Sequence, residues 1–352
     1  MVIAPARGYN PGMTSLAALI DRLARVPAVE VPSPPGVEAA LLASLRYLGS
    51  DAAQHSTELD PYWPKWDSPW WHYLLCFELG EARRVPERAA MALLRALESF
   101  PVKIFPFTPD DLPPGCDLHS QTLCHCQLGS AYQMLSACGV DVDAALPWVA
   151  PWFVRYQMAD GGLSCDHDAY LVKGECPSSM VGTVAPLEAM LLGELTGERA
   201  SFVDRAATFL SERRLMLGSS SQFNAVERER APAWRKQCFP RFYFYDVLRG
   251  LSAITRWSER RGAPLPLTAI EPAVEHLLGS FPDGVVRVER LAQEGITTGA
   301  LDATGTWVRK PASSFALFEA TSQIGSASPA LTREWGETRR RLLQLHEARR
   351  IA

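Results

Sequence analysis

The stretch FVRYQMADGGLSC at residues 153–165, followed by SSMVGTVAPLEAML at residues 178–191, decides the expected fold of this chain. The first segment ends a helix near Gln157, and Asp160, Gly161 and Gly162 follow it. Glycine reverses a chain after a helix at low cost because it readily adopts positive φ. The second segment opens with two serines and continues with small apolar residues, as a helix buried on all sides does. The sequence therefore predicts an outer helix, a glycine turn and an inner helix.

The same unit recurs along the chain, as an apolar helix, a short polar turn and a second, amphipathic helix. The copies begin near Ser68, Ser120, Ser178, Phe239 and Ser313, and residues 14–26 with 36–49 supply a sixth pair. The start points are 50 to 75 residues apart, so the repeat is degenerate. We expect a single domain over 1–352, with N-terminal helices and a linker at 1–59 and repeated hairpins at 60–350.

About six such hairpins predict an all-α fold, an α/α toroid with inner and outer rings of helices around a central cavity. The inner helices are apolar throughout, whereas the second helices carry Arg and Glu on one face. In a toroid the loops that precede the inner helices gather at one mouth of the ring. An open helical solenoid is the alternative.

The quoted stretch resembles the repeat of squalene and other triterpene cyclases and of protein prenyltransferase β subunits, over roughly residues 60–350. The resemblance implies the toroid fold and an isoprenoid substrate. Four departures argue against transferring the chemistry directly. Leu163 stands where the cyclase repeat has an aromatic residue, and the acidic DxDD signature is reduced to Cys165-Asp166-His167-Asp168. A helical DDxxD motif and the zinc-binding set of the prenyltransferases are also absent from the sequence.

Composition narrows the function classes. The chain has 352 residues, 47% of them hydrophobic, and a formal net charge of −4. Basic residues are scattered, which argues against a nucleic-acid partner. Neither a run of the roughly 18 apolar residues that a membrane span needs nor a secretory signal pattern occurs. We therefore expect a cytoplasmic protein with reduced cysteines. The composition is compatible with a homo-oligomer.

Chemistry-bearing residues concentrate between Cys116 and Cys176, where five of the eight cysteines and three of the seven histidines lie. Thiols, imidazoles and carboxylates ligate metals, move protons or attack carbon. The first group is Cys124-His125-Cys126, at the predicted start of an inner helix. Side chains about 100° apart do not all face one cavity. Within this group His125 is the preferred catalytic residue, because imidazole titrates near neutrality.

The second group surrounds the loop before the third inner helix. Cys165 and Cys176 flank this loop, and a thiol near a helix N-terminus has a lowered pKa. Asp166 or Asp168 is expected to orient the imidazole or a thiol. A disulfide between Cys165 and Cys176, or a loop clamped by zinc, is the alternative. The remaining cysteines are interpreted as buried fillers: Cys76, Cys138 and Cys238.

In type and order these residues look similar to those of linalool dehydratase/isomerase, an α/α-barrel enzyme. The resemblance implies metal-free acid–base chemistry with paired cysteines, a His, an Asp and a Tyr around an apolar pocket. The matching residues are Asp60, Tyr62, His125 (or His119), Cys165 and Cys176. Cys124-His125 is also similar to the Cys-His pair of the lanthionine cyclases, whose other ligand motif is missing.

Two aromatic segments are candidate substrate-binding walls, since aromatic faces stabilise carbocations and contact prenyl chains. The residues are Trp63, Trp66, Trp70, Trp71, Tyr243 and Tyr245. Structural packing explains the same residues equally well. Asp246 is either a helix cap or a proton-transfer group.

Together these features predict an enzyme of the terpenoid lyase or isomerase type, without a cofactor. It would dehydrate, hydrate, isomerise or cyclise a small hydrophobic substrate by acid–base chemistry. One alternative is an enzyme that binds zinc or iron through some of His119, His125, Cys126, His167 and Cys176, with Asp166 as a further ligand. The other is a non-catalytic toroid that binds a lipid or serves as a scaffold.

Overall fold

The computed structural model describes residues 15–62, 66, 68–99, 124–166, 168–292, 297–301, 304, 306–311 and 313–352. Helices account for 61% of the described residues, which confirms the all-α class. In the described parts, the strands β1 (Thr297–Leu301) and β2 (Trp307–Pro311) form one antiparallel hairpin that the sequence did not predict. None of the described helices combines the length and the apolar character needed to cross a membrane.

The five predicted hairpins each appear as paired helices. They are α4 (Pro69–Glu78) with α5 (Glu87–Ser99), α6 (His125–Cys138) with α7 (Val142–Ala145) and α8 (Val149–Tyr156), α9 (Met180–Met190) with α10 (Gly197–Glu212), α12 (Val247–Arg261) with α13 (Leu267–Ser280), and α14 (Ala316–Thr321) with α15 (Pro329–Glu347). The N-terminal pair is α1 (Leu16–Arg25) and α2 (Val37–Leu48), and α3 (Asp51–Leu59) follows as an additional helix. A second unpredicted segment, α11 (Ala225–Arg230) with short 3-10 turns on both sides, lies between α10 and α12.

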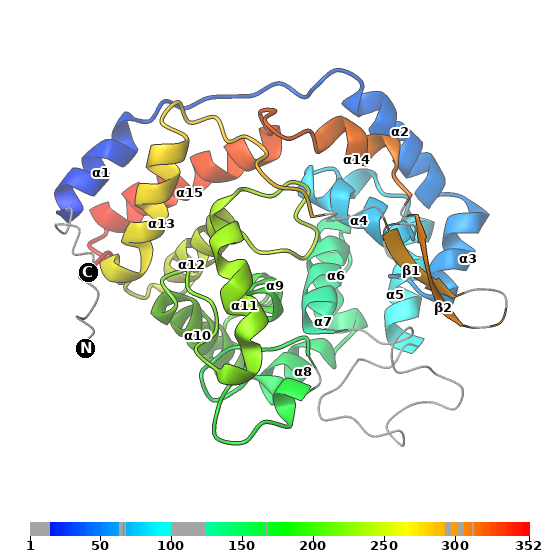
Figure 1. Ribbon diagram of the computed structural model, residues 1–352, viewed down its shortest axis with the longest axis horizontal. Helices are drawn as coiled ribbons and strands as arrows, with labels where there is room; N and C mark the ends of the chain where they lie inside the picture. Colours follow the sequence, from blue (N-terminus) through cyan, green and yellow to red (C-terminus); the bar gives the residue numbers. More distant parts are fainter. Residues whose placement is uncertain are drawn as a thin grey trace, which may run out of the picture.

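The first helices of the hairpins pack against one another in sequence order. α4 contacts α6, α6 contacts α9, and α9 contacts α12 (Figure 1). α2 contacts both α4 and α14, and α15 runs beside α12 and α1. Both α1 and the C-terminal residues are also tied to the region of α13, because Arg22 bridges to Glu275 at 2.6 Å and Ile351 pairs with Leu265 through the backbone. Segments far apart in sequence thus lie side by side.

The α6–α9 contact is the closest of these because Gly129 lies at it. A Cβ at this position would lie 2.5 Å from the carbonyl carbon of Ala185 and 2.6 Å from the nitrogen of Pro186. The two helix backbones therefore approach each other so closely that only glycine, which has no side chain, fits at this position. This contact fixes α6 along α9, and with it the residues at the start of α6.

The two glycines of the turn after α8 are required for different physical reasons. Gly161 has φ of +87°, as the sequence predicts. Gly162 does not have a positive φ, but a Cβ at this position would lie 2.6 Å from the Cβ of Ser178 and 2.7 Å from the ring of Phe209. The Gln157 side chain donates to the carbonyl of Gly161 at 2.8 Å, so it secures the turn. The turn delivers the chain to the N-terminal end of α9.

A charged network, which the sequence did not predict, lies buried among α6, α9 and α12. The guanidinium of Arg249 contacts the Glu188 carboxylate at 2.6 Å, and the Gln133 amide donates to the same carboxylate at 3.3 Å. Asp246, at the N-cap of α12, accepts from the Arg249 backbone N–H and pairs with Arg241 at 2.7 Å. Ionic bonds therefore cross-link three helices whose sequences are mostly apolar.

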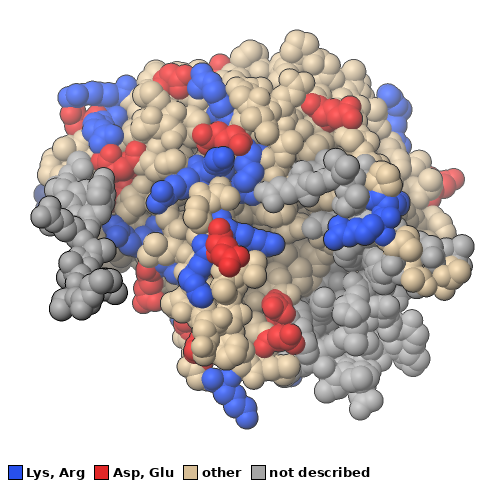
Figure 2. Space-filling view, viewed as in Figure 1, with Lys and Arg blue, Asp and Glu red and all other residues tan. Residues whose placement is uncertain are grey.

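The surface carries both signs of charge. Basic and acidic side chains are interspersed on the face shown in Figure 2, with a wide area of other residues around them. Several charges are paired across elements, including Arg84 with Glu38 at 2.6 Å. Among the described residues on this face, acidic side chains thus lie beside the basic ones, and these residues form no large basic area of the kind that nucleic acid favours.

Candidate functional site

The start of α6 carries the densest cluster of reactive groups in the described part of the chain. Cys124 is the N-cap residue, with extended backbone angles, and its backbone N–H donates to the Gln127 side chain at 2.8 Å. The Cys124 sulfur in turn accepts from the Gln127 backbone N–H, which completes a capping box. A sulfur thus takes the position that a serine or threonine oxygen usually fills.

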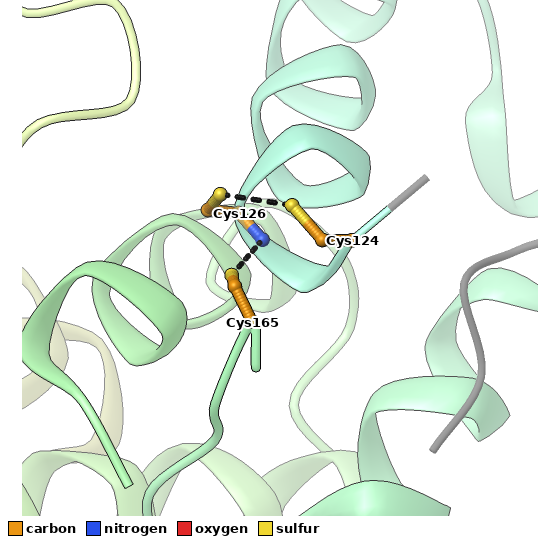
Figure 3. Close-up of side chains that lie close together, drawn as sticks. All are labelled: Cys124, Cys126 and Cys165. Carbon is orange, nitrogen blue, oxygen red and sulfur yellow. Dashed lines mark hydrogen bonds between the residues drawn. The ribbon is translucent and has the colours of Figure 1, made fainter. Parts of the chain in front are cut away.

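Three sulfurs come together at this helix end. The Sγ atoms of Cys124 and Cys126 are 3.2 Å apart, and the backbone N–H of Cys126 donates to Sγ of Cys165 at 3.4 Å (Figure 3). The three sulfurs all lie within 4.8 Å of one another. Residues two apart on a regular helix point in different directions. Cys124 and Cys126 meet because Cys124 has non-helical backbone angles.

The hydrogen bonds of the cluster favour a negative charge on one of its sulfurs. Hydrogen bonds from Cys126 and then Cys165 lower the pKa of the Cys124 thiol well below its usual value, and the N–H of Gln127 assists them. The same contacts, together with burial, raise the pKa values of Cys126 and Cys165. The N-terminal end of a helix also favours negative charge. The arrangement therefore favours the charged form at Cys124, with Cys126 and Cys165 as its hydrogen-bond donors.

Cys165 reaches α6 because its segment is anchored to α9. The backbone N–H of Leu163 donates to the Thr183 hydroxyl at 2.9 Å, and its carbonyl accepts from Ser179 at 2.8 Å. Next along the chain, the Ser164 N–H donates to the Tyr170 hydroxyl at 3.0 Å. The position of the third sulfur relative to the other two therefore depends on how α9 lies against α6.

His125, the first residue of α6, is fully buried. Its Nδ1 is 2.8 Å from the Ser164 carbonyl oxygen, and its ring packs against Tyr156 of α8 and Tyr170, each 5.9 Å away between centroids. A carbonyl only accepts hydrogen bonds, so Nδ1 carries the proton. Burial lowers the pKa of this histidine. The residue is a neutral imidazole that orients Ser164 and hence Cys165.

Two tyrosines complete the cluster on its other side. Tyr62 and Tyr243 share a hydrogen bond, with ring centroids 6.4 Å apart. Burial raises the pKa of both, and the charge near Cys124 adds to the effect in each case. Both phenols therefore stay protonated donors at neutral pH. Asp60 fixes the start of this segment, because its carboxylate accepts from the Tyr62 backbone N–H at 2.8 Å.

An aromatic wall extends from these tyrosines. Trp71 packs 4.1 Å from Trp66, 5.2 Å from Tyr62 and 5.0 Å from Phe242 between ring centroids. Trp70 contacts Tyr62 edge-on at 5.9 Å. The predicted wall residues Trp66, Trp70, Trp71 and Tyr243 thus gather near the cysteines. Trp63 lies outside the described residues.

The other predicted site residues lie elsewhere. Asp166 and Asp168 are exposed, and the Asp166 carboxylate accepts from the Asp168 N–H at 3.2 Å, so neither carboxylate takes the orienting position expected beside the imidazole or a thiol. Cys176 lies near the Arg213 guanidinium and is not in the sulfur cluster. Cys165 and Cys176 are both free thiols, so the alternative disulfide is not formed. The Tyr245 hydroxyl donates to the Leu215 carbonyl at 2.9 Å, which makes this tyrosine a packing residue.

Several residues of the site were not singled out from sequence. The sequence places Cys124 beside His125 at the start of an inner helix but does not mark Cys124 as the N-cap, and no motif points to Tyr170. A Cys-x-Cys pair at the predicted start of an inner helix was the available signal. Of the expected metal ligands only Cys126 belongs to the three-sulfur group, while His119 and His167 lie outside the described residues.

No family model matches the sequence, and the searches of curated proteins and of solved structures likewise gave no match. The chemistry of the site is therefore argued from its own geometry.

Proposed function

We propose that this protein is an acid–base enzyme of the lyase or isomerase type, with Cys124 as the base. The observation that carries the proposal is the three-sulfur cluster, in which hydrogen bonds from two thiols lower the pKa of Cys124 and two protonated tyrosines lie close by. Acid and base groups with pKa values pushed apart at one place are typical of proton-transfer sites. A general acid and a general base within hydrogen-bond reach of a substrate each accelerate such reactions.

For dehydration of an alcohol, the steps balance within the cluster. The thiol of Cys165 or Cys126 gives its proton to the hydroxyl, and the C–O bond breaks to release water. The Cys124 thiolate takes a proton from the neighbouring carbon, and the electrons of that C–H bond form the C=C bond. The proton then returns between the hydrogen-bonded sulfurs, so the enzyme ends in its starting state. Hydration is the reverse sequence.

We propose a small hydrophobic substrate of isoprenoid type on an α/α toroid. The order of packing, α4 to α6 to α9 to α12 with α2 joining α4 to α14, supports a ring of helices. Trp66, Trp71 and Tyr243 present aromatic faces beside the sulfurs, which suits an apolar chain and a developing positive charge.

The test is proton exchange. The protein is incubated in deuterated water with an acyclic monoterpene alcohol, and deuterium incorporation and alkene formation are followed by mass spectrometry. Cys124→Ser should lower the rate by about 100-fold or more, the range of general acid–base effects. Cys138→Ser is the matched control, because Cys138 is also a partly buried free thiol but lies at the far end of α6. Wild-type rates in Cys124→Ser, or no exchange with this alcohol or its alkene product, would overturn the proposal.

A second candidate is a metalloenzyme in which the three sulfurs hold zinc. Zn–S bonds of about 2.3 Å place tetrahedral ligands about 3.8 Å apart, and the sulfurs already lie within 4.8 Å. The donor set therefore fits the ion, with a fourth position left for water. Metal analysis of protein purified without a tag separates the two candidates. One zinc per chain, lost in Cys126→Ser and required for turnover, would favour the metalloenzyme.

A further inference from the structure

A cleft of about 630 Å³ lies at the opposite end of α6 from the cysteines. It is bounded by the C-terminal parts of α4, α6 and α12 and by the turn after α9, near α7 in Figure 1. Since α6 has 14 residues at 1.5 Å each, roughly 20 Å separate its two ends. The volume is in the range of ligand pockets. The cleft is therefore a separate place from the candidate active site.

The charged side chains of the cleft differ in whether they have partners. Asp143 is neutralised by Arg199 at 2.6 Å and also accepts from the Tyr132 hydroxyl. Asp141 caps α7 by accepting the Ala144 N–H at 3.1 Å. Arg256 has neither an ion pair nor a hydrogen bond from its side chain to any residue in the described ranges. The cleft thus offers one guanidinium whose donors are unused.

The rest of the wall is mixed. Phe77, Val140 and Leu192 are apolar, and Leu192 is 43% exposed. Ser136 and Gln133 add polar groups from α6. Apolar walls with a few placed polar groups are the usual composition of small-molecule sites. A guanidinium prefers planar carboxylates, which it binds through two parallel hydrogen bonds. The two aspartates nearby disfavour ligands with more than one negative charge.

We propose that this cleft binds a small monocarboxylate with an apolar tail, whose carboxylate pairs with Arg256. The apolar tail lies against Phe77, Val140 and Leu192. The proposal is independent of the acid–base reaction at the cysteines, because the two sites share no side chain.

Octanoate is the probe, and octanol is the neutral control of equal length. Calorimetry should show one octanoate site in the wild-type protein, and Arg256→Gln should weaken it by about 10- to 100-fold, the value of a charged hydrogen bond. Octanol should bind both proteins alike. Arg46→Gln is the matched control variant, since Arg46 is an exposed arginine on α2 outside the cleft. Octanoate affinity that is unchanged in Arg256→Gln, or no saturable binding to wild-type protein, would overturn the proposal.

A measurement on the wild-type chain guards against misfolding of the variant. Phenylglyoxal modifies accessible arginines, and peptide mass spectrometry reports each site. Octanoate should protect Arg256 while leaving the modification of Arg46 unchanged, and octanol should protect neither. Equal modification of Arg256 with and without octanoate would contradict the proposed pairing.

Discussion

The contact at Gly129 provides a sharp test of how the fold positions the cysteine cluster. In Gly129→Ala the added Cβ would lie 2.5 Å from the Ala185 carbonyl carbon and 2.8 Å from its oxygen. Ordinary contacts between such atoms are about 3.5 Å or longer, so α6 must move away from α9 by about 1 Å. The opposing atoms are backbone and have no rotamer to change.

The expected cost follows from two opposed effects. Overpacking a tight contact costs about 1–3 kcal/mol, and a rigid backbone neighbour places this case at the upper end. Alanine has a better helix propensity than glycine by about 1 kcal/mol. The net expectation is a loss of about 2 kcal/mol for Gly129→Ala. Gly336 lies within α15, and a Cβ there meets no atom within 4 Å. Gly336→Ala should therefore gain about 1 kcal/mol.

Urea denaturation measures both free energies of unfolding, and equal slopes against urea establish that the variants unfold alike. A second readout is the cluster itself. Because Cys165 is anchored to α9 and Cys126 belongs to α6, a shift between the helices should break the 3.4 Å contact from Cys126 to Cys165. The reaction rate of the cysteines with a thiol reagent should then change. If Gly129→Ala is as stable as wild type while Gly336→Ala is stabilised, the close approach is refuted.

Three further outcomes are expected. Arg249→Met leaves the Glu188 carboxylate buried without its partner, so the free energy of unfolding in urea should fall by about 3–5 kcal/mol. Adding Glu188→Leu to this variant should recover most of the lost stability. Additive losses from the two substitutions would contradict the pairing. Burial raises the pKa of Glu78 from 4.5 to about 7. The protonated side chain therefore contributes stability that is fully present below pH 4.5 and is lost as the pH rises through 7. The free energy of unfolding should fall by at most about 3 kcal/mol over this range. Glu78→Gln should remove this pH dependence, and an unchanged slope between pH 4.5 and 7 would count against it. The pKa of Cys124 is lowered, whereas burial raises the pKa of Cys138 to about 11. Iodoacetamide should therefore alkylate Cys124 faster than Cys138 at neutral pH, and the rate at Cys124 should fall less steeply below pH 9. Parallel pH profiles for the two thiols, read by mass spectrometry, would argue against a lowered pKa at Cys124.

The repeat was readable from sequence because local patterns specify it. Helix periodicity, the serines that begin α9 and the Gly161 turn are all set by neighbouring residues. The strands β1 and β2 and the segment of α11 were missed because they interrupt the repeat and have no counterpart in the other hairpins.

The candidate site was only partly predictable. Cys165 and Tyr62 were chosen by residue type, and the structure brings both to the start of α6. Cys176 and Asp166 have equally suitable chemistry, but their positions depend on how the loop at 164–178 folds. The choice of Cys124 over His125 depends on a single non-helical residue at the helix boundary, which no periodicity reveals. The pairing of Glu188 with Arg249 joins residues 61 positions apart, and composition alone gives no sign of it.

The network of Gln133, Glu188 and Arg249 has a mechanical consequence. It links α6, α9 and α12 through directional charged bonds in a dry interior, where sliding one helix along another would strip a carboxylate of its partner. Apolar packing alone tolerates small slides much better. These three helices should therefore respond to load as one stiff unit. Any movement that admits a substrate to the cysteine cluster then falls to the connecting segments, above all to those that carry Tyr62 and Tyr243.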